Sequence, residues 1–233
     1  MGLLAGPVPV DDVRVWIGDV TSRLLGDTIG MSEAGWHSPS LLPGWSRAHV
    51  ATHLARNADR FATIVADGSC DGPCADPDVQ FLELECGADR TGIDLQIDLD
   101  SSAGALDRAW RSVDDWDRPI RIGDDEQPLS VLPLIRLHEV AVHHLDLDIS
   151  AFVDDLAPET AAWLLRWVLS RFVGTHGPAM TITSSSGQTA TVGSGRVMRK
   201  VSGTDQRLWA WLCGRAPADA VDGARGLSMD LLA

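Results

Sequence analysis

The sequence has no tyrosine, only four cysteines in 233 residues, and a single lysine, Lys200, beside eighteen arginines. Four cysteines are too few for a disulfide-stabilised scaffold, which indicates a reducing compartment. No apolar run approaches the roughly 20 residues that a membrane-spanning helix needs. Residues 1–10 have no basic residue ahead of their short apolar stretch, so they make a poor signal peptide. We therefore expect a cytoplasmic protein with no membrane partner, and we expect a monomer.

Positive charge is also scarce, because 19 basic residues face 33 acidic ones and the formal net charge is −14. Such a surface repels phosphate backbones, which argues against a nucleic-acid partner. Apolar residues make up 45% of the chain and charged residues 22%. This balance is ordinary for a folded globular protein and excludes extensive disorder.

Four segments of the first two thirds show the periodicity of amphipathic helices, with apolar residues three or four positions apart. In the first of them the stripe includes Val13, Ile17, Val20 and Leu24. Ser46 is a suitable N-cap for the second. Four helices joined by loops favour a four-helix bundle. The predicted helices span residues 10–29, 46–67, 95–116 and 130–149.

After about residue 150 the composition shifts to the short Thr-rich and Val-rich runs that are typical of strands. We therefore predict the α+β class, with a four-helix bundle over residues 1–152 and a small α+β domain over residues 153–233. The elements expected in the second domain are a helix over 158–173, a hairpin of 180–183 and 189–192, a strand over 196–201, and a helix over 205–213 that ends at Gly214.

Histidines gather in two of the predicted helices. His49 and His53 lie four residues apart in the second, and Glu139 and His143 have the same spacing in the fourth, so each pair projects from one helical face. A Glu and a His from one helix can meet a His from a neighbour and form the three-ligand site of a catalytic zinc ion. Alternatively, a Glu–His pair at this spacing forms a surface ion pair.

Three motifs contain or follow these residues. They are residues 41–58 (LLPGWSRAHVATHLARNA), residues 136–147 (RLHEVAVHHLDL) and residues 211–215 (WLCGR). In order and spacing they resemble the mycothiol-dependent maleylpyruvate isomerase family. The resemblance implies a DinB-like metal-binding four-helix bundle, a small α+β domain after it, and dependence on mycothiol.

Position by position, the resemblance implies that zinc or another divalent metal is held by His53, Glu139 and His143. His49 is a competing ligand one turn earlier, and its alternative role is a contact at the helix N-terminus. His144 points about 100° away from His143, so we expect it in the core or on the surface. Asp146 either orients a ligand or is a solvated helix end.

Two arginines are candidates for catalysis. Arg215 matches the family's C-terminal arginine, and the resemblance implies that it faces the site and binds mycothiol or a substrate carboxylate. Its alternative role is to cap a helix C-terminus. Arg136 lies one turn before Glu139 and is a weaker candidate, with a salt bridge to Glu139 as its alternative. Cys70 and Cys74 lie in a Gly/Pro loop with no histidine pair nearby, so we expect free thiols.

The reaction that the resemblance implies is the isomerisation of maleylpyruvate to fumarylpyruvate in aromatic degradation, with a small thiol and a small dicarboxylate as partners. The thiolate adds to the cis double bond, the bond rotates, and elimination returns the thiol. Three alternatives remain at this point: a mycothiol S-transferase, a metal-dependent hydrolase that uses bound water, and a non-catalytic binding protein. The complete His53, Glu139 and His143 set argues against the last.

Overall fold

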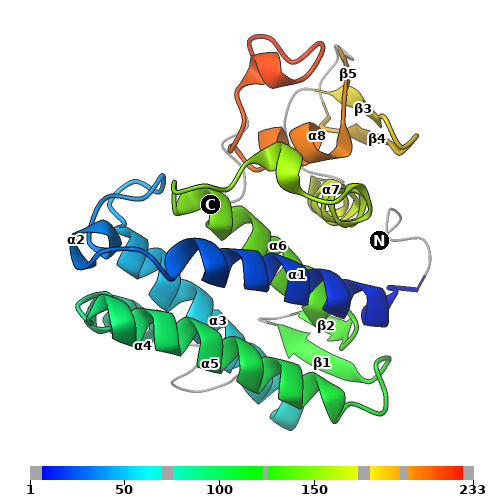
Figure 1. Cartoon of the computed structure of the whole chain (residues 1–233). Coiled ribbons are helices and arrows are strands. Elements are labelled where there is room, and N and C mark those ends of the chain that lie inside the picture. Colours follow the sequence, from blue (N-terminus) through cyan, green and yellow to red (C-terminus); the bar gives the residue numbers. More distant parts are fainter. Residues whose placement is uncertain (1–6, 70–75, 123–124, 173–178, 195–198, 228–233) are drawn as a thin grey trace. The chain divides into compact units, whose positions relative to one another are not determined.

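The computed structural model describes residues 7–69, 76–122, 125–172, 179–194 and 199–227 (Figure 1). These residues form two compact units. The first runs from Val10 to Ala151, and the second runs from Phe152 onward and includes residues 7–9.

The first unit is built on four long helices, and this confirms the predicted bundle (Figure 1). α3 packs against α5 and α6, and α1 packs against α6 and α5. Val13, Ile17, Val20 and Leu24 are buried, as their spacing in the sequence predicts. The four helices are α1 (Val10–Thr28), α3 (Arg47–Asp67), α5 (Gly92–Arg111) and α6 (Val131–Asp146).

Local caps decide where these helices begin and end. Ser46 caps α3 as expected, and its hydroxyl accepts the backbone N–H of His49. The predicted range of the third helix is wrong at both ends. Thr91 caps α5, so the helix begins before residue 95, and it ends at Arg111 instead of running to residue 116. α6 is also shorter than predicted, and the chain turns after it at Asp148, which has a φ of 50°.

The apolar pattern does not predict several elements of this unit. α4 buries only Ala88, so no apolar stripe reveals it. Its signals are local: Asp76 is its N-cap and Pro77 occupies its first turn. α4 approaches α3 closely because Gly87 has no side chain; a Cβ there would lie 2.2 Å from Cγ2 of Thr52. The elements not predicted are α2 (Glu33–Trp36), α4 (Pro77–Ala88) and the antiparallel strands β1 (Pro119–Ile122) and β2 (Asp125–Pro128).

The second unit combines two helices with a three-stranded sheet of order β4-β3-β5. β4 is antiparallel to β3, which confirms the predicted hairpin, and β5 is parallel to β3. The α+β class is therefore confirmed, although residues 196–198 of the predicted third strand lie outside the described residues. The elements are α7 (Pro158–Phe172), β3 (Met180–Ser184), β4 (Thr189–Val192), β5 (Arg199–Gly203), α8 (Asp205–Leu212) and the 3-10 turns Val153–Asp155 and Ala218–Ala220.

None of the described helices has both the length and the apolar character needed to cross a bilayer. The longest, α3, has 21 residues, and charged side chains interrupt it throughout.

Candidate metal centre

Two helices of the first unit supply the candidate site. His53 lies in the second turn of α3, and Glu139 and His143 lie one turn apart on α6. Because α3 packs against α6, the convergence predicted from the sequence takes place between these two helices. All three side chains are partly buried; that of His143 is 12% exposed and that of His53 is 25% exposed.

The three side chains face a common point. Nε2 of His53 lies 3.0 Å from Oε2 of Glu139, and Nε2 of His143 lies 3.6 Å from the same oxygen. The two imidazole rings are 4.7 Å apart at an angle of 71°. One possible ligand atom from each residue lies within 4.8 Å of the other two, and within the described ranges these residues form the one such group of His, Cys, Asp or Glu.

These separations suit a tetrahedral metal ion. Zinc–ligand bonds of about 2.0–2.2 Å at tetrahedral angles place neighbouring ligand atoms about 3.3–3.6 Å apart. The observed 3.0 and 3.6 Å to Glu139 lie close to that range. Two imidazoles and one carboxylate leave a fourth position open, as in catalytic zinc sites. The same donors also suit iron, nickel or cobalt, so they fit a divalent metal without identifying it.

Burial and hydrogen bonding set different charges on the three groups. Burial lowers the pKa of His53, and its hydrogen bond with Glu139 offsets this only in part. Burial alone would raise the pKa of Glu139, but hydrogen bonds from His143 and His53 hold it well below its usual range. Burial also acts to lower the pKa of His143, but Asp146 and Glu139 raise it above its ordinary value. Near neutral pH, Glu139 is therefore ionised and His53 neutral, and His143 holds its proton most firmly.

Two neighbours orient the imidazoles. Oδ2 of Asp146 lies 2.8 Å from Nδ1 of His143, and Asp146 is only 1% exposed. Its position therefore matches the orienting role and not that of a solvated helix end, since a proton held on Nδ1 leaves Nε2 for a metal. The ring of Trp45, in the loop before α3, lies 5.6 Å from the ring of His53. Nothing in the sequence around Trp45 predicts this contact.

His49 has the N-terminal role that the sequence left as its alternative. Its Nδ1 lies 3.2 Å from the backbone nitrogen of Ser46 and 2.7 Å from the Ser46 hydroxyl. Because a backbone N–H can only donate, Nδ1 is the acceptor and Nε2 carries the proton. Nε2 lies 3.4 Å from Oε1 of Glu85 on α4. Both ring nitrogens thus have protein partners, which favours His53 over His49 as the ligand from α3.

His144 turns away from the site, as its position on α6 predicts. It is 7% exposed, and its Nε2 lies 2.9 Å from Oδ2 of Asp27 on α1. This pair links α6 to α1 within the bundle.

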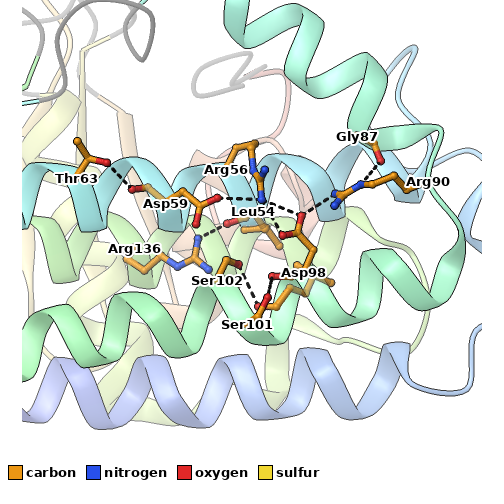
Figure 2. Close-up of polar contacts among 11 residues, drawn as sticks. Leu54, Arg56, Asp59, Thr63, Gly87, Arg90, Asp98, Ser101, Ser102 and Arg136 are labelled. Carbon is orange, nitrogen blue, oxygen red and sulfur yellow. Dashed lines mark hydrogen bonds and ion pairs between the residues drawn. The ribbon is translucent and has the colours of Figure 1, made fainter.

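Arg136 is 3% exposed and turns toward α3 (Figure 2). Its Nη1 donates to the carbonyl of Leu54 and to Oδ1 of Asn57, both at 2.8 Å. Burial lowers the pKa of Arg136 to about 10, although Glu139 acts to raise it. The guanidinium therefore ties α6 to α3 one turn from Glu139, in place of the salt bridge with Glu139 considered from the sequence. Its role in catalysis stays a prediction.

Two further arginines, Arg56 and Arg90, join α3 to α5 and to the end of α4 (Figure 2). Nη2 of Arg56 lies 2.8 and 2.9 Å from the two carboxylate oxygens of Asp98 on α5. Arg90 donates to Asp98 at 2.7 Å and to the carbonyl of Gly87 at 2.9 Å. These two cations are thus engaged in packing helices together.

Arg215 belongs to the second unit and follows α8 directly. Its backbone N–H donates to the carbonyl of Ala210 at 2.7 Å, and Gly214 has a φ of 72°, which is the Schellman ending of a helix. Its Nη1 donates to the carbonyl of Cys213 at 2.6 Å. The helix-terminal contact considered from the sequence is therefore present, and the catalytic role of Arg215 stays a prediction.

We call His53, Glu139 and His143 the metal group; in the part of the chain that the structure describes, no cysteine belongs to it. Cys86 is a free, exposed thiol, and Cys213 is a free, buried one. Cys70 and Cys74, which we expect to be free, lie outside the described residues.

The family model described as the mycothiol maleylpyruvate isomerase N-terminal domain matches residues 17–148, more than half of the 233 residues. The crystal structure of the mycothiol-dependent maleylpyruvate isomerase has a TM-score of 0.82, and that of a histidine-to-alanine mutant has 0.80. Each is 22% identical to this chain and covers 91% of it and 92% of its own length, which shows a shared fold. No curated protein matches the chain.

Proposed function

This chain belongs to the mycothiol maleylpyruvate isomerase family, and from that premise we propose that it is a mycothiol-dependent, metal-assisted isomerase that converts maleylpyruvate to fumarylpyruvate. One observation carries the proposal: His53, Glu139 and His143 offer ligand atoms within 4.8 Å of one another. We propose zinc as the metal because this donor set, with one open position, is the usual one of catalytic zinc.

Zinc at this site would supply a Lewis acid that stabilises a thiolate near neutral pH. The thiol is the nucleophile of the proposed reaction. Its addition across the cis double bond of the substrate forms a C–S bond and leaves a carbon–carbon single bond that can rotate. Elimination breaks the C–S bond and returns the thiol. The net reaction therefore consumes no proton, electron or further reactant.

The chain's own residues orient the reactants and compensate charge. Asp146 holds the Nδ1 proton of His143, so that Nε2 faces the site. Glu139 is ionised and would neutralise part of the charge of a bound metal. For Arg215 we propose bidentate binding of a substrate carboxylate, with stabilisation of the enolate charge that develops when the thiolate adds. That role rests on the match of residues 211–215 to the family motif.

A mycothiol S-transferase is the second candidate. The group of His53, Glu139 and His143 would act on the thiol, and an activated thiol can attack any electrophile that reaches it. The two activities therefore differ in the fate of the thiol and not in the metal site.

The test is to incubate the metal-loaded protein with maleylpyruvate, with and without mycothiol, and to follow the product by NMR. The proposal predicts fumarylpyruvate only when mycothiol is present, with all of the thiol recovered. A stable thioether product would instead identify a transferase. Turnover of an amide or ester substrate without mycothiol would identify a hydrolase and contradict the proposal.

A further inference from the structure

Four polar, partly buried side chains form a stripe along α3. His49, His53, Arg56 and Arg60 follow one another at steps of four, three and four residues. At 3.6 residues per turn, these steps keep all four within an arc of about 60°. All four are partly buried, and most of the α3 residues between them are fully buried. The stripe therefore continues from the metal ligand His53 along the same side of the helix to Arg60.

Arg60 differs from the other members of this stripe. The other three each have a polar partner on the chain, at 2.7 Å for His49, 3.0 Å for His53 and 2.8 Å for Arg56. In the part of the chain that is described, Arg60 has no hydrogen bond and no ion pair. A partly buried cation with no hydrogen bond loses hydration without a direct contact that would offset the loss. The carboxylates of Glu83 and Glu139 act on Arg60 only through longer-range electrostatics. Its place next to the metal group is therefore explained best by a partner that binds from outside the chain.

The guanidinium of Arg60 lies within electrostatic reach of the metal group. Burial lowers the pKa of Arg60, while Glu83 and Glu139 act to raise it. In the other direction, Arg60 acts to lower the pKa of His53. The rise of an α-helix puts Arg60 about 10 Å beyond His53 at the backbone, and long helical side chains lean toward the N-terminus and so toward His53.

We propose that Arg60 is a specificity-determining residue that binds a carboxylate of the substrate at the end remote from the metal. This inference rests on the proposed function, because it needs a ligand held at His53, Glu139 and His143. A substrate with two carboxylates calls for two cationic contacts in a protein of net charge −14. Arg60 supplies one of them from the bundle. The planar guanidinium suits bidentate carboxylate binding.

Arg56 and Arg136, which lie on the same two helices as the candidate metal ligands, differ from Arg60 because each already has hydrogen-bond partners within the bundle. Arg56 is bound to both oxygens of Asp98, and Arg136 is bound to Leu54 and Asn57. Of these three guanidinium groups, that of Arg60 alone has no hydrogen bond and no ion pair within the described residues.

The experiment uses the full chain loaded with Co²⁺, whose visible absorption reports ligands at the metal. Maleate and isocrotonate are titrated separately, since they differ in one carboxylate and share the cis double bond. We expect maleate to bind the wild type more tightly than isocrotonate. Arg60→Gln should lower the affinity for maleate about tenfold or more, which is the scale of one charge-assisted hydrogen bond. The affinity for isocrotonate and the cobalt content should stay unchanged. The maleate affinity of Arg60→Lys should lie between those of the wild type and Arg60→Gln.

The matched control is Arg111→Gln, which removes the same charge from a side chain that is 70% exposed on α5. It should leave both affinities unchanged. Equal maleate affinity in the wild type and Arg60→Gln overturns the inference. Loss of cobalt from Arg60→Gln also overturns it, because Arg60 would then support the metal site itself. A wild type that isomerises maleylpyruvate but does not distinguish maleate from isocrotonate refutes the role of Arg60 alone. A wild type that holds no metal refutes the proposed function as well.

Discussion

Asp146 and His143 lie three residues apart on α6, and Oδ2 of the first is 2.8 Å from Nδ1 of the second. One helix thereby supplies a candidate metal ligand and the carboxylate that fixes its tautomer. Asp146 is almost fully buried, so its charge is compensated within the site and not by water. The contact holds the imidazole with Nε2 toward Glu139, as a metal would require.

Asp146→Asn should weaken metal binding by about 10- to 100-fold, the usual effect of removing a carboxylate behind a ligating histidine. The amide can present its NH₂ group to Nδ1 and then favours the tautomer with the proton on Nε2. Competition with a chromophoric chelator measures the affinity. Asp148→Asn, two residues further on and exposed, is the control and should bind metal as the wild type does. Unchanged affinity in Asp146→Asn would remove the orienting role.

Metal affinity should fall as the pH falls below the raised pKa of His143, by up to about tenfold per pH unit for one displaced proton. Asp146 and Glu139, acting against burial, raise that pKa in the metal-free protein, whereas burial lowers the pKa of His53. The proton on His143 stabilises the metal-free fold at pH values below the pKa of an unfolded histidine, and this stabilisation is lost as the pH rises through the folded-state pKa. Calorimetric titration in buffers of different ionisation enthalpy counts the protons released. Constant affinity from about pH 5 to pH 8 would contradict this assignment of charges.

Arg136 should act as a positioning residue for the two ligand-bearing helices. Arg136→Met removes the bonds to Leu54 and Asn57 and should lower the free energy of unfolding by about 2–3 kcal/mol, because buried acceptors lose their donor. Metal affinity should fall as well, since α3 and α6 lose a tie one turn from Glu139. The double variant Arg136→Met with Asn57→Leu should recover part of the free energy of unfolding that Arg136→Met loses. Unchanged unfolding and unchanged metal affinity in Arg136→Met would show that the tie has no such effect.

Arg215→Ala separates the two roles of that residue. If Arg215 stabilises the enolate charge, kcat should fall by about 100-fold or more while metal content stays unchanged. Arg215→Lys should rescue poorly, because an ammonium lacks the planar fork. Arg215→Ala removes the hydrogen bond from Nη1 to the carbonyl of Cys213, and this should cause only a small loss of thermal stability. Wild-type kcat and KM in Arg215→Ala would leave Arg215 with its helix-terminal contact alone.

The bundle was largely predictable because helical periodicity determines which residues share a face, and the choice of His53, Glu139 and His143 came from the resemblance to the family motifs. The four-residue step between Glu139 and His143 holds in the structure, and Ser46 caps the helix that carries His53. α4 was missed because it buries only Ala88, so its sequence has no apolar stripe. It can approach α3 closely because Gly87 has no side chain, and an apolar pattern does not predict such a contact.

Other features depend on tertiary contacts that no local spacing encodes. Asp146 had two possible roles in the sequence, and its burial and the rotamer of His143 distinguish them. A salt bridge from Arg136 to Glu139 on its own helix was the alternative that the sequence left open, but Arg136 bonds to the neighbouring helix. The sequence analysis did not single out Arg60, because its lack of a hydrogen-bonded partner emerges only when the surrounding helices are in place.

The central claim is that His53, Glu139 and His143 bind one divalent metal, and elemental analysis of the purified protein and its single alanine variants tests it most directly. The account predicts about one metal per wild-type chain and a sharp loss in His53→Ala, Glu139→Ala and His143→Ala, whereas His144→Ala retains metal because His144 faces Asp27. Full metal content in folded His53→Ala would contradict the claim and point to His49 as the ligand from α3.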